Sequence, residues 1–265
     1  IMPKQAFVFP QEADFCASLR ELFAQNGLSD FSDDATVQKL YQLSRHLCEV
    51  NQSLNLTAVT DPQELIVKHL ADSLSIAAHI PQGARVLDVG CGGGFPSLPL
   101  AIARPDLSIT AIDSTEKKVT YVRETAQLLS LPAPSFEALC GRAEVLAAPN
   151  SPLRQRFDVV TARAVASLPV LCELCLPFVR KGGRFLAMKS VRAEEELAEV
   201  QKANLLQRLG ADGQPRIVYY PLSGKESTEI YQRALLLIEK TADTPAAYPR
   251  SYAKILKEFR GASPS

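Results

Sequence analysis

The residues with the clearest chemical potential form a glycine-rich loop that follows a short apolar run. Val86, Leu87 and Val89 fit a buried parallel strand, and the glycines after them let the backbone turn sharply and approach a ligand without an intervening Cβ. Pro96 suits the first turn of a helix, where a missing N–H costs nothing. Strand, glycine turn and helix in this order are typical of a nucleotide-binding unit.

The spacing of the glycines indicates which kind of nucleotide. Gly90 and Gly92 fit the dinucleotide pattern Gly-x-Gly-x-x-Gly, but Phe95 occupies its last position. Phe95 would prevent the close helix-to-strand packing that glycine permits, which disfavours an NAD-dependent oxidoreductase. A second strand ends at Asp113, 23 positions after Gly90, where a carboxylate can bind both ribose hydroxyls. Loop and acid together predict an adenosine-bearing ligand that has no pyrophosphate.

Further candidates lie at the carboxyl ends of the other predicted strands, because ligands of an open parallel sheet bind there. Asp88 could orient the loop or contact the ligand directly. Ala143 and Glu144 begin a short helix and could place a backbone N–H and a carboxylate near an adenine edge. Interaction with the helix dipole is the alternative role for Glu144.

Two cations also follow buried strands. Arg163 needs an anionic or hydrogen-bonding partner, because its charge cannot be buried alone; a ligand carboxylate would serve, as would an internal acid such as Asp88 or Glu144. Lys189 follows the same logic and could face an RNA phosphate or a target base. Both are therefore candidates for the active site.

A lone histidine, His69, lies on a predicted amphipathic helix ahead of the loop. It could be a base or an RNA contact, although such histidines usually have a structural role. Asp72 and Ser73 beside it could hold this helix to the glycine loop.

The elements that must position these residues alternate regularly from Arg85 onward. Strands are predicted at 85–89, 108–113, 135–140, 157–162, 184–189, 216–222 and 231–239. Helices between the first several indicate a doubly wound parallel sheet. The last connection is too short for a helical crossover, so the seventh strand should be antiparallel.

The region before this sheet is predicted to be a helical cap. Helical patterns cover 11–24, a stretch from Asp33 that Asp34 can cap, and 63–79, whereas 51–57 is too irregular for a helix. We divide the chain of 265 residues into a cap (1–80), a core (81–241) and a basic tail (242–265). The tail could lie along an RNA backbone or form a solvated terminal helix.

Composition excludes some classes of protein. There are 29 basic and 29 acidic residues, so any nucleic-acid surface must be local, and no stretch approaches the roughly 20 apolar residues of a membrane span. The six cysteines are scattered, and Cys172 and Cys175 fall in a helical pattern without further ligands for a metal. We expect a cytoplasmic, monomeric protein without a metal site.

Several motifs occur in an order that is more specific than the loop alone. They are Asn55-Leu56-Thr57, His69-Leu70-Ala71-Asp72-Ser73-Leu74, Asp88-Val89-Gly90-Cys91-Gly92-Gly93-Gly94-Phe95-Pro96, Arg163-Ala164-Val165-Ala166-Ser167-Leu168 and Tyr248-Pro249-Arg250. In these segments, over about residues 35–250, the chain resembles the RsmG (GidB) family within the class I S-adenosylmethionine-dependent methyltransferases. It departs from the family pattern after Arg250, where many members continue with a short Lys/Pro/Gly tail.

The resemblance implies a Rossmann-like class I methyltransferase fold and the 16S rRNA guanine-N7 methyltransferase activity of that family. It implies S-adenosylmethionine as the cofactor and 16S rRNA or the small ribosomal subunit as the partner. The implied cofactor positions are Gly90, Phe95, Asp113, Ser114, Thr115, Ala143, Glu144 and Arg163.

The chemistry agrees with the absence of an obvious catalytic base, because N7 of neutral guanine has a free lone pair and loses no proton on methylation. The site must supply proximity and geometry. Two other classes stay open: a methyltransferase for a small molecule or a protein, and a non-catalytic module that binds an adenosine ligand in ribosome assembly.

Overall fold

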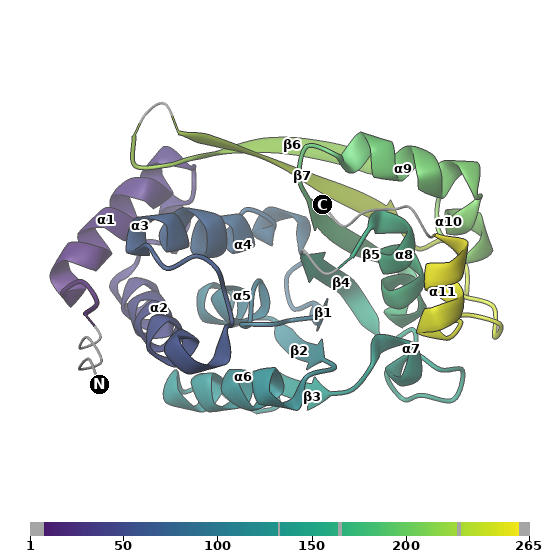
Figure 1. Ribbon diagram of the computed structural model, residues 1–265, viewed down its shortest axis with the longest axis horizontal. Coiled ribbons are helices and arrows are strands. Elements are labelled where there is room, and N and C mark those ends of the chain that lie inside the picture. The colour runs from purple at the N-terminus through teal and green to yellow at the C-terminus, as the bar shows by residue number, and fades with distance from the viewer. Residues whose placement is uncertain (1–7, 132, 164–165, 227–228, 260–265) are drawn as a thin grey trace, which may run out of the picture.

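A seven-stranded sheet with helices on both faces forms the centre of the molecule (Figure 1). The computed structural model describes residues 8–131, 133–163, 166–226 and 229–259. The sheet order is β3-β2-β1-β4-β5-β7-β6. The strands are β1 (Arg85–Val89), β2 (Ser108–Asp113), β3 (Phe136–Cys140), β4 (Phe157–Arg163), β5 (Val179–Lys189), β6 (Arg216–Ser223) and β7 (Ile230–Glu239).

The predicted strand pattern is confirmed. β1 to β5 pair in parallel, and β7 runs antiparallel to both β5 and β6. β1 and β2 have the predicted bounds, and the largest difference is in β5, which begins at Val179 instead of residue 184. The reversal of strand order on either side of β1 opens a crevice at the carboxyl ends of β1 and β4.

Each face of the sheet buries a separate hydrophobic cluster. Val86 of β1 packs with the N-terminal helices, whereas Leu87 points to the opposite cluster, as the two-residue period of a strand requires. The first face is covered by α1 (Glu12–Gln25), α2 (Asp34–Leu54), α5 (Ser97–Ala103) and α6 (Glu116–Leu128). The second is covered by α8 (Leu168–Cys175), α9 (Ala193–Lys202), α10 (Leu205–Arg208) and α11 (Tyr252–Glu258). Cys172 and Cys175 are buried in this second cluster.

The N-terminal helices differ from the prediction in two details. Asp33, not Asp34, caps α2, since its side chain accepts from the Thr36 N–H at 3.0 Å. The predicted irregular segment is partly helical, because α2 continues to Leu54 and ends only where Asn55 turns into the left-handed region (φ 50°).

The helix predicted at 63–79 is real but interrupted. It comprises α3 (Pro62–Leu65), a π-helical segment (Ile66–Ala71), α4 (Asp72–Leu74) and a 3₁₀ turn (Ala77–His79). Single π turns inside α-helices occur frequently at functional sites. Here the π turn contains Lys68 and His69.

The predicted tail is packed onto the core as far as it is described. α11 lies against α8 (Figure 1), and Ile255 is fully buried in the second cluster. At the other end of the molecule, the last residue of β6 contacts the C-terminal end of α1. The Asn26 side chain donates to the Ser223 carbonyl and accepts from the Ser223 N–H. Short α7 (Ala143–Leu146) follows β3, and the remaining 3₁₀ turns are Ser29–Phe31 and Leu176–Phe178.

Candidate active site

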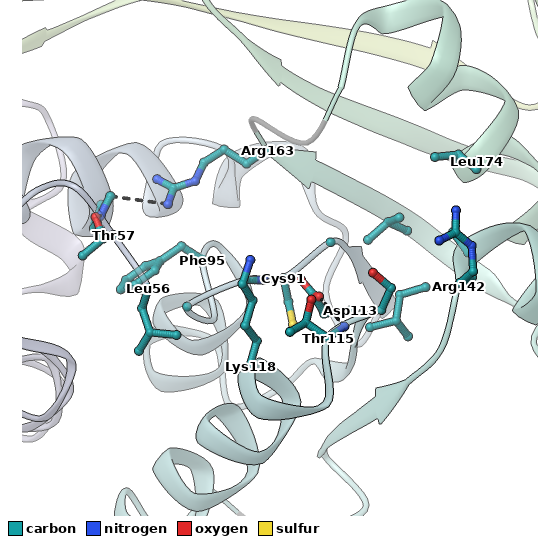
Figure 2. Close-up of a pocket in the computed structure, with 18 of the residues that line it drawn as sticks. Leu56, Thr57, Cys91, Phe95, Asp113, Thr115, Lys118, Arg142, Arg163 and Leu174 are labelled. Atoms are coloured by element: carbon teal, nitrogen blue, oxygen red, sulfur yellow. Dashed lines mark hydrogen bonds between the residues drawn. The ribbon is translucent and has the colours of Figure 1, made fainter. Parts of the chain in front are cut away.

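A cleft of about 690 Å³ opens beyond the carboxyl ends of β1, β2, β3 and β4. Its size and position are those of a site for a nucleoside-sized ligand. Figure 2 shows Thr57, Phe95 and Arg163 at one end, Arg142 and Leu174 at the other, and Asp113 with Thr115 between them. All but two of the predicted site residues line it: His69, Gly90, Gly92, Phe95, Asp113, Ser114, Thr115, Ala143, Glu144 and Arg163.

The glycine loop is held by the neighbouring strand. The backbone N–H groups of Gly90 and Cys91 both donate to the carbonyl of Ile112, at 2.8 and 3.0 Å. Gly94 has a φ of +87°, and a Cβ there would lie 2.3 Å from the Leu98 side chain. Glycine is therefore required at position 94 for both backbone conformation and packing.

Asp113 connects the loop to the start of α6. Its carboxylate accepts from the backbone N–H of Gly92 at 3.1 Å and from that of Thr115 at 2.8 Å. The residue is 9% exposed and lines the cleft. The two N–H groups hold the carboxylate in one orientation beside the space where the sequence predicts a ribose.

The end of the cleft near β3 is formed by the turn into α7. Arg142 pairs with the Glu144 carboxylate at 2.6 Å, and its guanidinium lies over the ring of Tyr252 from α11 at 5.0 Å. Ala143 lies between them in the chain and lines the same wall. Arg142 belongs to the stretch 141–144 that follows the third predicted strand, where site residues were expected, whereas Tyr252 was not expected at the cofactor site.

The opposite end brings together Phe95, His69 and Arg163. The Phe95 ring lies 4.8 Å from the His69 ring and 5.4 Å from the Arg163 guanidinium. Arg163 donates to the carbonyl of Lys68 at 2.9 Å. The π turn thus contributes a backbone acceptor that holds Arg163 at the mouth of the glycine loop.

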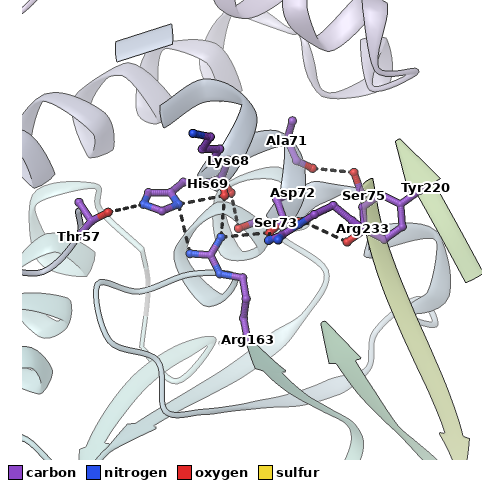
Figure 3. A network of polar contacts seen from close by, with 10 residues as sticks. All are labelled: Thr57, Lys68, His69, Ala71, Asp72, Ser73, Ser75, Arg163, Tyr220 and Arg233. Atoms are coloured by element: carbon purple, nitrogen blue, oxygen red, sulfur yellow. Dashed lines mark hydrogen bonds and ion pairs between the residues drawn. The ribbon is translucent and has the colours of Figure 1, made fainter. Parts of the chain in front are cut away.

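A buried carboxylate, Asp72, organises this end (Figure 3). Its side chain is 0% exposed and pairs with Arg163 at 3.3 Å and with Arg233 of β7 through both carboxylate oxygens; the Tyr220 hydroxyl donates to it at 3.1 Å. Burial alone would raise the pKa of Asp72, but the hydrogen bonds and charges of Arg233 and Arg163 outweigh it and hold that pKa below its usual value. Asp72 therefore joins the cap to three strands of the sheet, β4, β6 and β7, rather than to the glycine loop itself.

His69 is a weak base in this site, because its pKa is lowered, and its Nε2 is already hydrogen-bonded to Thr57. Thr57 Oγ1 accepts from the Val59 N–H at 3.0 Å, which leaves its own hydrogen for Nε2 of His69 at 2.7 Å. Nδ1 lies 3.0 Å from the Lys68 carbonyl, to which it can donate. Burial first, and then the Arg163 charge, lower the pKa of His69 to about 4, so the ring is neutral at physiological pH.

This shift predicts a pH effect on stability. Between the ordinary pKa of about 6.5 and the folded value of about 4, the unfolded state binds more protons at His69, so stability falls as the pH falls through this window. Between pH 7 and pH 4.5, the unfolding free energy of the native chain should fall by about 2 kcal/mol more than that of His69→Gln. Urea denaturation at the two pH values measures the difference. Equal losses in the two proteins would contradict the assignment. Asp88 titrates in the same window with opposite sign, but it is present in both proteins and cancels in the comparison.

The two predicted residues that do not line the cleft are Asp88 and Lys189. Asp88 is 1% exposed and accepts from the Thr161 hydroxyl at 3.1 Å; burial raises its pKa to about 6, and the nearby Ser97 and Thr161 side chains partly oppose this. Asp88 is thus enclosed near the end of β1, outside the lining of the cleft.

The sequence suggested that Lys189 could face an RNA phosphate or a target base, but the structure encloses it. Its side chain is 1% exposed, pairs with Glu196 of α9 at 2.9 Å and donates to the Ala166 carbonyl at 3.0 Å. Because the lysine follows a buried strand, an internal acid satisfies its charge. An internal acid was considered as the partner of Arg163 but was not named as a partner of Lys189.

Sequence reasoning also missed cleft residues from distant segments. They include Leu56, Thr57, Lys68, Tyr231, Arg233 and Tyr252. One signal was available, since the Arg233 charge directly precedes the apolar run 234–238 of β7. No candidate metal cluster of His, Cys, Asp or Glu occurs among the described residues, and none of their helices is long and apolar enough to cross a bilayer.

The comparisons with known proteins decide the family. The family model of GidB, rRNA small subunit methyltransferase G, matches residues 36–213. The chain belongs to the GidB family. Curated GidB relatives named ribosomal RNA small subunit methyltransferase G include one from Lactobacillus delbrueckii subsp. bulgaricus, 39% identical over 87% of this chain and 95% of the relative. Another, from an Exiguobacterium species, is 41% identical over 83% of this chain and 90% of the relative.

A solved structure agrees on the fold of this GidB chain. The O-methyltransferase from Bacillus cereus, crystallised with SAH, has a TM-score of 0.51 and 17% sequence identity over 75% of this chain and 91% of that one. At this identity the likeness supports the Rossmann-like methyltransferase fold alone. The resemblance to the GidB family, which the ordered sequence motifs indicated, is confirmed.

Proposed function

We propose that the protein transfers the methyl group of S-adenosylmethionine to N7 of a guanine in 16S rRNA. Family membership supports the methyl donor and the small-subunit rRNA substrate. The observation that supports N7 is the chemistry of the cleft, in which His69, the histidine among its lining residues, has a pKa lowered to about 4 and is thus a weak base, with Nε2 bonded to Thr57. A site of this kind suits a nucleophile that needs no deprotonation.

The residues around the glycine loop fit S-adenosylmethionine. When bound, the cofactor supplies its methyl group from a positively charged sulfur. We assign the ribose to Asp113, whose carboxylate is already oriented by two backbone N–H groups, with Ser114 and Thr115 beside it. The glycine loop follows β1, Asp113 ends β2, and Ala143 and Glu144 follow β3, which lies beyond β2 in the sheet. We therefore place the adenine, on the other side of the ribose from the loop, towards Ala143 and Glu144. Gly90, Gly92 and Phe95 then border the reacting end.

The opposite half of the cleft has the character of an RNA contact. Arg163 and Arg233 share one carboxylate, Asp72, which leaves one excess positive charge there. Lys68 lies over the Tyr231 ring at 4.8 Å and is paired with Glu64 at 2.7 Å. Cations suit phosphates, and an aromatic ring suits a base. We propose that this half positions the target nucleotide, with His69 and Arg163 as positioning residues.

Two of the three segments of the chain then have tasks in the cleft. The cap, residues 1–80, supplies Thr57, Lys68 and His69 to the target half of the cleft, and the core, residues 81–241, supplies Arg163, Tyr231 and Arg233 to that half and most of the cofactor half. An rRNA substrate places the activity in the cytoplasm.

A labelling experiment tests the function. The protein is incubated with methyl-labelled S-adenosylmethionine and 30S subunits from a strain that lacks the enzyme, and the rRNA is mapped by primer extension after aniline cleavage. We expect one labelled guanine at which the chain breaks, because N7 methylation makes the base alkali-labile. Label without cleavage would contradict N7. Label only on protein or small molecules, or no label at all, would favour the two alternative functions.

A further inference from the structure

The C-terminal segment is joined to the core by a buried ion pair. Glu173 of α8 is 0% exposed and accepts from both the backbone N–H and the guanidinium of Arg250. Arg250 also pairs with Glu258, which binds Arg208 of α10 at 2.9 Å. Truncating one partner of such a buried pair is costly, so this docking is well specified. The described part of the segment is an integral piece of the fold rather than a free basic arm.

This docking brings an aromatic ring to the cleft. Tyr252, the first residue of α11, lines the cleft at the same end as Arg142 and Leu174. The Arg142 guanidinium lies over the Tyr252 ring, and Glu144 holds Arg142 in turn. An aromatic ring and a planar guanidinium therefore stand beside Ala143, where the adenine is assigned.

We propose that Tyr252 and Arg142 form an adenine-binding wall that the C-terminal segment completes. Both groups offer flat, polarisable surfaces against which a purine ring can stack. Tyr252 lies beyond residues 36–213, the part of the chain that the family model matches. The affinity for the cofactor thus depends on a segment about 140 residues away from Asp113 in sequence.

The cofactor is a better occupant of this wall than an RNA base. Arg142 and Leu174 lie at the end of the cleft opposite to Thr57 and Arg163 (Figure 2), whereas the excess positive charge is at the Arg163 end. The Arg142 charge is already paired with Glu144. The inference rests on the proposed orientation of the cofactor, with its ribose at Asp113.

Calorimetric titration of the full-length protein tests the inference, with S-adenosylhomocysteine and 5′-methylthioadenosine as probes. Tyr252→Ala should raise both dissociation constants about tenfold, because both probes contain the adenine and stacking of one base is typically worth that much. Tyr252→Phe should stay within about twofold of the native chain, since it keeps the ring. Arg142→Ala, at an exposed side chain, should raise both constants by a smaller factor.

Two controls separate this inference from the cofactor assignment. Lys254→Ala changes an exposed residue of the same helix and should leave both constants unchanged. Asp113→Asn should weaken binding in any case. Unchanged affinity in Tyr252→Ala and Arg142→Ala, together with weakened binding in Asp113→Asn, would overturn the adenine wall alone. If Asp113→Asn also binds normally, the location of the cofactor is wrong and the inference fails with it. Loss of RNA affinity with unchanged probe affinity would assign the wall to RNA instead.

Discussion

Asp113→Ala is expected to raise the dissociation constant of S-adenosylmethionine by about 100-fold or more. The carboxylate accepts from the Gly92 and Thr115 N–H groups and is assigned two ribose hydroxyls. Hydrogen bonds to a charged group are worth about 1.5–3 kcal/mol each, and 1.4 kcal/mol is a factor of ten in affinity. The substitution removes the ribose contacts and also releases the glycine loop. Calorimetry measures the effect directly.

The matched variant for this prediction is Asp113→Asn. An amide oxygen can still accept from one backbone N–H, so the loop should keep more of its order while the charge is lost. We therefore expect an intermediate affinity, with a melting temperature close to that of the native chain. A dissociation constant that does not change in the alanine variant would remove Asp113 from the cofactor site.

The second large effect concerns Asp72, which neutralises two arginines at once. Asp72→Asn leaves Arg163 and Arg233 facing each other in a buried site without a counter-charge. Breaking a buried ion pair in this way costs about 3–5 kcal/mol of unfolding free energy. Urea denaturation should show this loss. Methyl transfer should also decline in variant molecules that remain folded, because Arg163 loses one of its anchors.

Glu64→Gln is the control for Asp72 on the same helix. Glu64 pairs with Lys68 in a partly exposed ion pair, which is worth less than about 1 kcal/mol. A similar small loss in Asp72→Asn would show that the two arginines find other partners and that the network does not organise the active site.

Much of the fold was predictable because its signals are local. Apolar runs marked the strands, and the short connection between β6 and β7 required an antiparallel last strand. The details that differ depend on the surroundings. α2 continues through polar residues to Leu54, and the π turn at Ile66–Ala71 has no pattern that distinguishes it from an ordinary helix. Tertiary contacts decide such endings and interruptions, because the local preferences are too small to do so.

The cofactor half of the site followed from the sequence for a similar reason. Glycines after a strand and an acid at the end of the next strand are neighbours in any parallel sheet of this type, whatever else the chain does. Gly90 and Asp113 could therefore be found from their spacing. The ordered motifs added the family, which the comparisons confirmed.

The location and the ion-pair partners of the charged residues could not be predicted from the sequence. Arg163 and Lys189 both follow buried strands, yet one lines the cleft and the other is enclosed with Glu196. The difference lies in which helix packs over each strand end, and α9 brings an acid only to Lys189. A residue pattern along one segment contains no information on an acid that approaches from another.

By itself the sequence determined the sheet, the glycine loop with its acid, and the family. Only the tertiary structure decided what surrounds them. It pairs Asp72 with two arginines, keeps His69 neutral and brings Tyr252 to the cleft. Strands and loops are specified by neighbours in the chain, whereas pairing and burial of charges depend on groups that folding brings from far away. The target half of the site is built almost entirely from such distant groups.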